Sequence, residues 1–284
     1  MSKEIVVVES DQSCGAAVFG LDLGKALNCE QVSELRSLWL QHHVLSFPEQ
    51  TLTDDNLERF SQYFGDFGDD PFIQPVPDRE HVIAVERRAD ETSSIFAEAF
   101  HTDWSFQPTP PAGTCLYGIT IPTSGGDTLF ANQHQALTEM PNELRKRIEG
   151  KQGIHSAKLA YAPDGAYGEM DSTTGRSMRI VASEEANNTQ LHPLIRAHPE
   201  TGREGLFGCL GYIIGIEGMG DEAFALLSEL HQWQTQEQFI YRHEWQPNML
   251  VMWDNRSVLH AATGGYEGQA RLLHRTTIGA QRKL

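Results

Sequence analysis

Short apolar runs that end at proline, glycine or a polar cluster limit what this chain can fold into. Val44–Phe47 stops at Pro48, and residues 113–121 stop at Pro122. Runs of this length with β-branched residues are typical of strands. Further strands are predicted at 5–8, 81–85, 128–130, 249–253 and 272–278, and helices at 31–42, 53–64, 133–139, 141–149 and 221–233. Helices and strands do not alternate regularly, which favours a mainly β fold with helical decoration, a sandwich or jelly roll, over a parallel α/β sheet.

No linker-like segment divides the 284 residues, so a single domain spanning 1–284 is predicted. Residues 88–99 are small and polar and lead into a strand that carries His101. Residues 151–190 are rich in Gly, Ser, Thr and Asp and are predicted to form a long loop. Loops of this length are uncommon unless they act as lids or binding loops, so both segments are candidate lids.

The net charge of −17 opposes binding to nucleic acid or to anionic membranes. It does not oppose a small anionic substrate, provided that arginines line a local site. Four widely spaced cysteines without a C-x-x-C pattern predict reduced thiols in a cytoplasmic protein: Cys14, Cys29, Cys115 and Cys209. The N-terminus lacks the apolar core of a signal peptide, and no apolar run of roughly 18 residues is present to span a membrane.

His101 and Asp103, separated by Thr102, are followed far downstream by His260. If residues 101 and 103 lie on one strand, their side chains point to the same face and reach one metal ion. Two imidazoles and one carboxylate leave three adjacent positions open on Fe(II), which suits O₂ activation. Alternatively, His101 merely hydrogen-bonds the carboxylate and His260 is a surface histidine, because 12 histidines and 39 acidic residues produce such pairs by chance.

Arg271 and Arg275 lie four residues apart on a predicted strand and therefore share one face. Two arginines that face an interior are costly unless they pair with anions, and a guanidinium binds a carboxylate or sulfonate through two hydrogen bonds. Structural salt bridges are the alternative, although the position of the pair shortly after His260 favours a site. Thr128 follows Gly125-Gly126-Asp127, and its hydroxyl can donate to a bound carboxylate; Gly-Gly-Asp-Thr by itself is only a turn.

These blocks occur in an order that resembles the taurine dioxygenase family of Fe(II)/2-oxoglutarate-dependent oxygenases, including its phenoxyalkanoate dioxygenases. The resemblance runs from about residue 15 to 280. The blocks that carry it are His101-Thr102-Asp103-Trp104-Ser105-Phe106, Pro122-Thr123-Ser124-Gly125-Gly126-Asp127-Thr128, Val251-Met252-Trp253-Asp254-Asn255-Arg256-Ser257-Val258-Leu259-His260 and Arg271-Leu272-Leu273-His274-Arg275-Thr276-Thr277.

The resemblance implies a double-stranded β-helix, which is a jelly roll, and a role for each matching residue. His101, Asp103 and His260 match the iron ligands. Thr128 and Arg271 match the residues that hold the distal carboxylate of 2-oxoglutarate. The resemblance also implies that the protein uses Fe(II), 2-oxoglutarate as cosubstrate and O₂. It implies in addition that the protein forms a homo-oligomer, either a dimer or a tetramer. Arg275 matches the arginine that takes the anionic group of the primary substrate.

The sequence departs from taurine-specific members in two stretches, 64–72 and 97–100. Those members carry a histidine near the first stretch and an asparagine in the second, and neither is present here. Taurine is therefore in doubt, and a larger or more apolar acid is compatible with the sequence. Phe72, Phe106 and Phe207 are candidates to line an apolar pocket, with plain core packing as the alternative.

The predicted function is an Fe(II)- and 2-oxoglutarate-dependent dioxygenase that hydroxylates a small sulfonate or carboxylate and releases succinate and CO₂. Hydroxylation next to a heteroatom would allow C–S, C–O or C–N cleavage. One alternative on the same fold is a natural-product oxygenase or desaturase. A Zn-dependent hydrolase would leave the arginine pair and Thr128 without a purpose, and a non-catalytic binding jelly roll would not need all three metal ligands.

Overall fold

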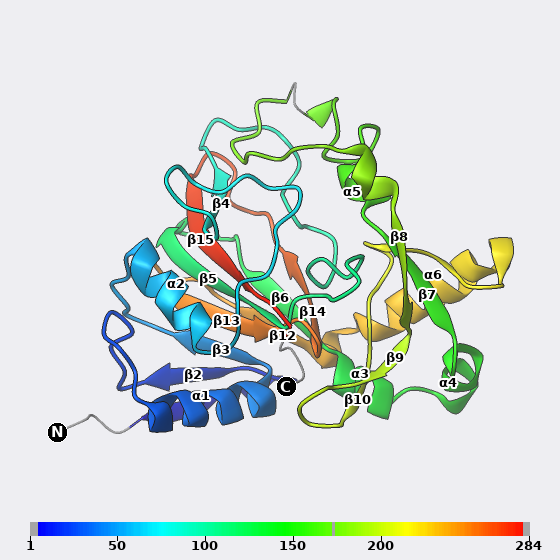
Figure 1. The fold of residues 1–284 in the computed structure, drawn as a ribbon, viewed down its shortest axis with the longest axis horizontal. Helices are drawn as coiled ribbons and strands as arrows, with labels where there is room; N and C mark the ends of the chain where they lie inside the picture. The colour runs from blue at the N-terminus through cyan, green and yellow to red at the C-terminus, as the bar shows by residue number, and fades with distance from the viewer. Residues whose placement is uncertain (1–4, 172–173, 281–284) are drawn as a thin grey trace.

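The computed structural model describes residues 5–171 and 174–280 and is built on a seven-stranded sheet (Figure 1). The strand order is β1-β2-β3-β13-β5-β15-β4, and all neighbours are antiparallel except β2 and β3. The strands of this large sheet are β1 (Val6–Glu9), β2 (Ala16–Phe19), β3 (Val44–Phe47), β4 (Ile83–Arg87), β5 (Gly113–Thr120), β13 (Leu250–Asp254) and β15 (Arg271–Ile278).

A smaller sheet with the order β12-β6-β14 packs against the inner face of the large sheet. Its strands are β6 (Thr128–Asn132), β12 (Ile240–His243) and β14 (Val258–Ala262). Because side chains alternate along a strand, Val251 and Trp253 of β13 point into the core between the sheets, where they meet Phe130 and Val258. The two packed sheets form the predicted jelly roll.

Helices α1 (Cys29–His42) and α2 (Asp54–Gln62) cover the outer face of the large sheet (Figure 1). Trp39 and Phe60 of these helices pack against the alternate residues of β13, Leu250 and Met252. Each helix begins with a capping box, and the cap of α2 is Thr53, as the sequence predicted. None of the described helices is both long and apolar enough to cross a membrane.

A second packed unit lies beside the two sheets, on the right in Figure 1. It contains a sheet of order β11-β7-β8, a β9–β10 hairpin and three helices with a shared apolar core. The elements are α3 (Gln133–Thr138), α4 (Asn142–Ile148), β7 (Gln152–Ser156), β8 (Thr189–Pro193), β9 (Ile195–Ala197), β10 (Glu204–Leu206), β11 (Ile213–Ile216) and α6 (Ala223–Gln234). Short helical segments are α5 (Lys158–Tyr161), η2 (Glu184–Asn187), η3 (Gly220–Glu222) and η4 (Glu237–Phe239).

The prediction that residues 151–190 form one long loop is wrong at both ends. β7 pairs with β8 and β11, and α5 and η2 lie between β7 and β8. β8 is mostly exposed, so it has no apolar run that would mark it as a strand. All four cysteines are free thiols, in agreement with the prediction.

Candidate metal centre

His101, Asp103 and His260 meet at one end of the space between the two sheets. Each offers a ligand atom, and these three atoms lie within 4.8 Å of one another. The Nε2 atoms of His101 and His260 each lie 3.7 Å from Oδ1 of Asp103. Both imidazoles and the carboxylate therefore point at a common position, as the sequence predicted.

The backbone that carries His101 and Asp103 differs from the predicted strand. Only His101 pairs, through an isolated bridge to His260 on β14, and Asp103 begins a turn in which Trp104 has φ of +48°. The Thr102 hydroxyl donates to the Asn255 carbonyl at 2.6 Å and fixes this turn to the chain before β14. The two ligands thus converge through a turn, because hydrogen bonds rather than strand pleating set their directions.

The protonation of the three groups suits a divalent cation. The Nδ1 of His101 lies 2.9 Å from the Ala99 carbonyl, to which it donates as N–H, so Nε2 carries the free lone pair. Burial and the neighbouring His101 lower the pKa of His260 to about 3, which keeps its imidazole neutral. Burial raises the pKa of Asp103, but Arg275 and His260 outweigh it and hold that pKa well below its usual range. Two imidazoles and a carboxylate are the donor set of a facial triad.

Arg271 lies on β15 in the same cavity and is buried, with no carboxylate within 4 Å of its guanidinium among the described residues. Its Nη2 donates to the Gly126 carbonyl at 3.2 Å, whereas its Nε has no hydrogen-bond partner among the described residues. Burial lowers the pKa of Arg271. A buried guanidinium with spare donors is expected to bind an anion.

Thr128 lies on β6 and lines the same cavity as Arg271. Its Oγ1 accepts a hydrogen bond from the Trp245 indole at 2.9 Å, which leaves the hydroxyl proton free to donate. The guanidinium of Arg271 also lies over the Trp245 ring, 5.9 Å from its centroid. Sequence reasoning missed Trp245, for which no motif gave a signal.

Arg275 lies four residues after Arg271 on strand β15 and already has an anionic partner. Its Nη2 forms an ion pair with Asp70, and its Nη1 lies 3.6 Å from Asp103. Burial lowers the pKa of Arg275, but these two carboxylates more than reverse the effect. Asp70 lies within a stretch singled out as a departure from the family pattern, yet nothing in the sequence linked it to Arg275.

Aromatic side chains form the wall beyond His101 and Arg275. Phe72 and Phe106 belong to this wall, with their ring centroids 5.7 Å apart. Tyr161 stacks on Phe72 at 4.9 Å, and Tyr212 meets both Phe106 at 5.1 Å and His101 at 6.0 Å. The two tyrosines lie on α5 and just before β11, where no sequence motif marks them.

Phe207 lies apart from this wall. Its ring stacks on His155 at a centroid distance of 5.6 Å, and the guanidinium of Arg196 lies over it at 4.2 Å. The sequence grouped Phe207 with Phe72 and Phe106, but the structure brings only the latter two together.

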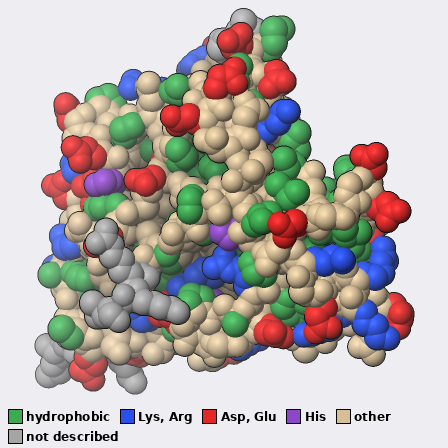
Figure 2. Space-filling view, turned by 45° about the vertical axis from the view of Figure 1, so that its right-hand side comes forward, with side chains coloured by type: hydrophobic (Ala, Val, Ile, Leu, Met, Phe, Trp, Pro, Cys, Tyr) green, Lys and Arg blue, Asp and Glu red, His purple; other side chains and the backbone are tan. Residues whose placement is uncertain are grey.

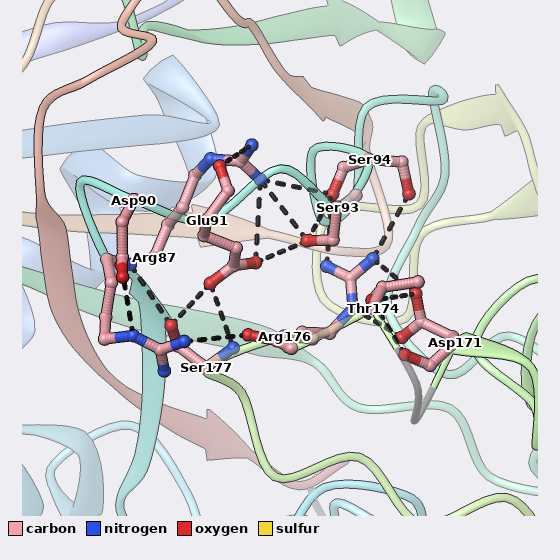
Figure 3. Close-up of polar contacts among 12 residues, drawn as sticks. Arg87, Asp90, Glu91, Ser93, Ser94, Asp171, Thr174, Arg176 and Ser177 are labelled. Carbon is pink, nitrogen blue, oxygen red and sulfur yellow. Dashed lines mark hydrogen bonds and ion pairs between the residues drawn. The ribbon is translucent and has the colours of Figure 1, made fainter.

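Two segments that the sequence named as candidate lids are tied to each other beside the cavity (Figure 3). The Glu91 carboxylate accepts hydrogen bonds from the hydroxyls of Ser93 and Ser177, and the Ser177 amide donates to it at 2.9 Å. Arg176 forms a two-pronged ion pair with Asp171, at 2.6 and 3.0 Å. Buried polar contacts therefore join residues 88–99 to residues 174–177.

The charged side chains are unevenly distributed over the surface. Figure 2 shows acidic side chains spread around the edge of one face, with basic side chains gathered near a central hollow. A local concentration of positive charge allows an anion to approach a protein whose total charge is negative.

Comparison with known proteins gives a consistent result. Residues 8–277 match the family described as "Taurine catabolism dioxygenase TauD, TfdA family". The chain is 30% identical to the (S)-phenoxypropionate/alpha-ketoglutarate-dioxygenase of Sphingobium herbicidovorans, over 98% of this chain and 96% of that protein. It is also 30% identical to a putative alpha-ketoglutarate-dependent sulfonate dioxygenase of Schizosaccharomyces pombe, over 98% of this chain and 70% of that protein. A putative alpha-ketoglutarate-dependent taurine dioxygenase structure from Burkholderia xenovorans superimposes with a TM-score of 0.79 at 29% identity, covering 98% of this chain and 93% of that one.

Proposed function

Because this chain belongs to the taurine catabolism dioxygenase TauD/TfdA family and is an Fe(II)- and alpha-ketoglutarate (2-oxoglutarate)-dependent dioxygenase, we propose that it hydroxylates a small organic acid, either a sulfonate or a carboxylate. The observation that carries this proposal is the meeting of a His-Asp-His cluster with two buried arginines in one cavity. The co-products are succinate and CO₂, and hydroxylation beside a heteroatom would break a C–S, C–O or C–N bond.

His101, Asp103 and His260 are the residues that would hold iron. Their fit is supported by the bare Nε2 of His101, the neutral imidazole of His260 and the ionised carboxylate of Asp103. Iron and 2-oxoglutarate together supply the chemistry that activates O₂. The second oxygen of Asp103 accepts a hydrogen bond from the Thr114 hydroxyl at 2.6 Å, which fixes the carboxylate in its orientation.

Arg271 and Thr128 would bind the distal carboxylate of 2-oxoglutarate. The support is the spare Nε donor of Arg271, its lack of any carboxylate within 4 Å among the described residues, and the free hydroxyl proton of Thr128. A carboxylate placed between a guanidinium and a hydroxyl receives charge-assisted hydrogen bonds that orient the cosubstrate toward the metal ligands.

Arg275 would take the acid group of the primary substrate, and Phe72 and Phe106 would contact its apolar part. The support is that the Arg275 side chain is buried next to Asp103 and packs at 5.2 Å on the Trp104 ring, within the aromatic wall. Such a wall excludes water from the oxidising centre and holds a substrate C–H bond near it.

The decisive experiment measures succinate formation by purified protein with Fe(II), ascorbate, O₂ and 2-oxoglutarate across a panel of sulfonates, sulfate esters and phenoxyalkanoates. Mass spectrometry identifies the product, since an added oxygen, a cleaved bond and a loss of two hydrogens are distinct. Stimulation by one class of acid supports the proposal. Iron-loaded protein that forms no succinate, even slowly without substrate, would refute it.

We further propose that the protein acts as a homo-oligomer, a dimer or tetramer, in the cytoplasm. The support is the family resemblance together with the free cysteines. Light scattering coupled to size-exclusion chromatography measures the mass of the assembly, and a monomer would contradict the first part.

A further inference from the structure

The carboxylate of Asp70 lies behind Arg275 of the cavity wall, and three side chains bind it. It forms an ion pair with Arg275, accepts a hydrogen bond from the Trp104 indole at 2.8 Å, and accepts another from the Thr277 hydroxyl at 3.0 Å. The Asp70 side chain is only 9% exposed. Donors from β15 and from the turn after Asp103 therefore hold this carboxylate in a defined place.

The two arginines of β15 differ in their charge environment because of Asp70. Arg275 has carboxylates on both sides, Asp70 in contact and Asp103 at 3.6 Å. Arg271 has no such partner in the described part of the chain, and burial lowers its pKa. Arg271 is thus prepared for an added anion, whereas Arg275 is already neutralised.

A substrate acid that entered this cavity beside an intact Asp70–Arg275 pair would be an unpaired buried anion. The cost of burying an unpaired charge is large, so the acid must take the place of the Asp70 carboxylate on the guanidinium. The acid then gains one ion pair while the protein loses one, and much of the affinity that a free arginine offers disappears.

We propose that Asp70 is a specificity-determining residue that acts as an internal competitor for Arg275, which the acid group of the substrate must displace. The proposal rests on the proposed function, since it concerns the same substrate site. It requires that acids gain little affinity from their charge and that contacts with the aromatic wall decide which acids bind.

The test uses Mn(II)-substituted protein loaded with 2-oxoglutarate, in which binding is measured by titration calorimetry without turnover. Phenoxyacetate and the uncharged 2-phenoxyethanol serve as matched probes, because they share a body and differ in the acid group. We expect the wild-type protein to bind the acid no more than about threefold tighter than the alcohol. An acid preference of about 30-fold or more, the value expected for a free buried guanidinium, would overturn the proposal.

The matched variants are Asp70→Asn and, as a control, Asp69→Asn, since Asp69 is adjacent and exposed. Asp70→Asn keeps the size of the side chain but removes the carboxylate in contact with Arg275, so binding of phenoxyacetate should tighten about tenfold or more while binding of 2-phenoxyethanol changes little. Asp69→Asn should change neither. Unchanged or weaker binding of the acid by a folded Asp70→Asn protein would overturn the proposal.

A double-mutant cycle separates competition from a structural role. In an Arg275→Gln background, Asp70→Asn should no longer improve binding of the acid, because the guanidinium for which Asp70 competes is absent. An improvement of the same size in both backgrounds would show that Asp70 acts by another route. The proposed function fails by a different readout, the absence of succinate from iron-loaded wild-type protein, so the two failures are distinguishable.

Discussion

The main chains of His101 and His260 hydrogen-bond to each other in both directions. The His101 N–H donates to the His260 carbonyl at 3.0 Å, and the His260 N–H donates to the His101 carbonyl at 2.7 Å. These bonds do not involve the imidazoles, so they persist when either side chain is removed. The positions of two candidate metal ligands from distant parts of the sequence are therefore set by the backbone.

Replacing His260 with Ala should abolish metal binding without unfolding the protein. Changes to residues that only support metal ligands typically cost 10–100-fold in affinity, so loss of a ligand should cost at least about 100-fold. Metal analysis after dialysis, with circular dichroism for the fold, provides the measurement. His81→Ala is the control, because the His81 side chain is 40% exposed and is not one of the three candidate ligands. Full iron content in a folded His260→Ala protein would contradict the ligand assignment.

Replacing Arg271 with Gln should raise the KM for 2-oxoglutarate by at least about 30-fold, since a buried carboxylate would lose its charged partner. Arg271→Lys should have an intermediate effect, because an ammonium keeps the charge but loses the planar fork. Thr128→Val removes a single hydroxyl and should raise the KM by about tenfold or less. Steady-state succinate formation at varied 2-oxoglutarate measures all three.

Arg147→Gln is the matched control for Arg271, because the Arg147 side chain lies on α4 and is 49% exposed. Its KM for 2-oxoglutarate should equal that of the wild type. If Arg271→Gln also left this KM unchanged, the cosubstrate would bind elsewhere.

Replacing Glu91 with Gln should loosen the two candidate lids together. An amide in place of the carboxylate presents an N–H₂ to surrounding donors, so the contacts with Ser93 and Ser177 weaken. Amide hydrogen exchange should accelerate by about tenfold in both 88–99 and 174–177. Asp90→Asn is the control, since the Asp90 side chain is 84% exposed. Faster exchange in only one segment would show that Glu91 does not couple them.

Replacing Asp254 with Asn should destabilise the fold. The buried Asp254 carboxylate accepts two hydrogen bonds from the Arg256 guanidinium, at 2.8 and 2.7 Å, and lies 3.0 Å from Nε2 of His198. Breaking a buried pair costs about 3 kcal/mol or more, which should lower Tm by about 6 °C or more. Calorimetry measures this difference, and Asp221→Asn, at an exposed position, should show none.

The cost of Asp254→Asn should depend on pH. Burial raises the pKa of Asp254, but Arg256 and His198 outweigh it and hold that pKa below its ordinary value of 3.8. The unfolded chain therefore takes up the proton first as the pH falls, so the stabilising contribution is present above pH 3.8 and is lost below it. The Tm difference between the two proteins should narrow in acid. A constant difference would indicate that the lost contribution is not ionic.

The elements with strong local patterns could be predicted from the sequence. β13 has a continuous apolar run from Leu250 to Trp253 because both of its faces are covered, one by helices and one by the smaller sheet. α2 has an N-cap with the expected chemistry at Thr53. β8 could not be predicted, because its stability depends on pairing with β7 and its own residues are mostly exposed.

The residues of the candidate site likewise divide into those that the sequence could predict and those that it could not. The residues proposed to hold the metal and the cosubstrate occur in ordered blocks of sequence that could be read directly. Asp70 and Tyr212 come from connecting segments and Tyr161 from the short helix α5, and their contacts depend on which side chains meet in the folded chain. No local pattern encodes the contact between Asp70 and Arg275, because it joins the chain before β4 to the last strand.

The pairing of β6, β14 and β15 within the sheets has a consequence for how such a protein diversifies. Thr128, His260 and Arg271 lie on strands that pair with neighbouring strands, whereas Asp70, Phe72 and Tyr212 lie in connections between strands and helices. Substitutions in those connections can therefore change which substrate binds without moving the residues on the paired strands. In a protein with this architecture, the substrate can change while the proposed oxidising site stays the same.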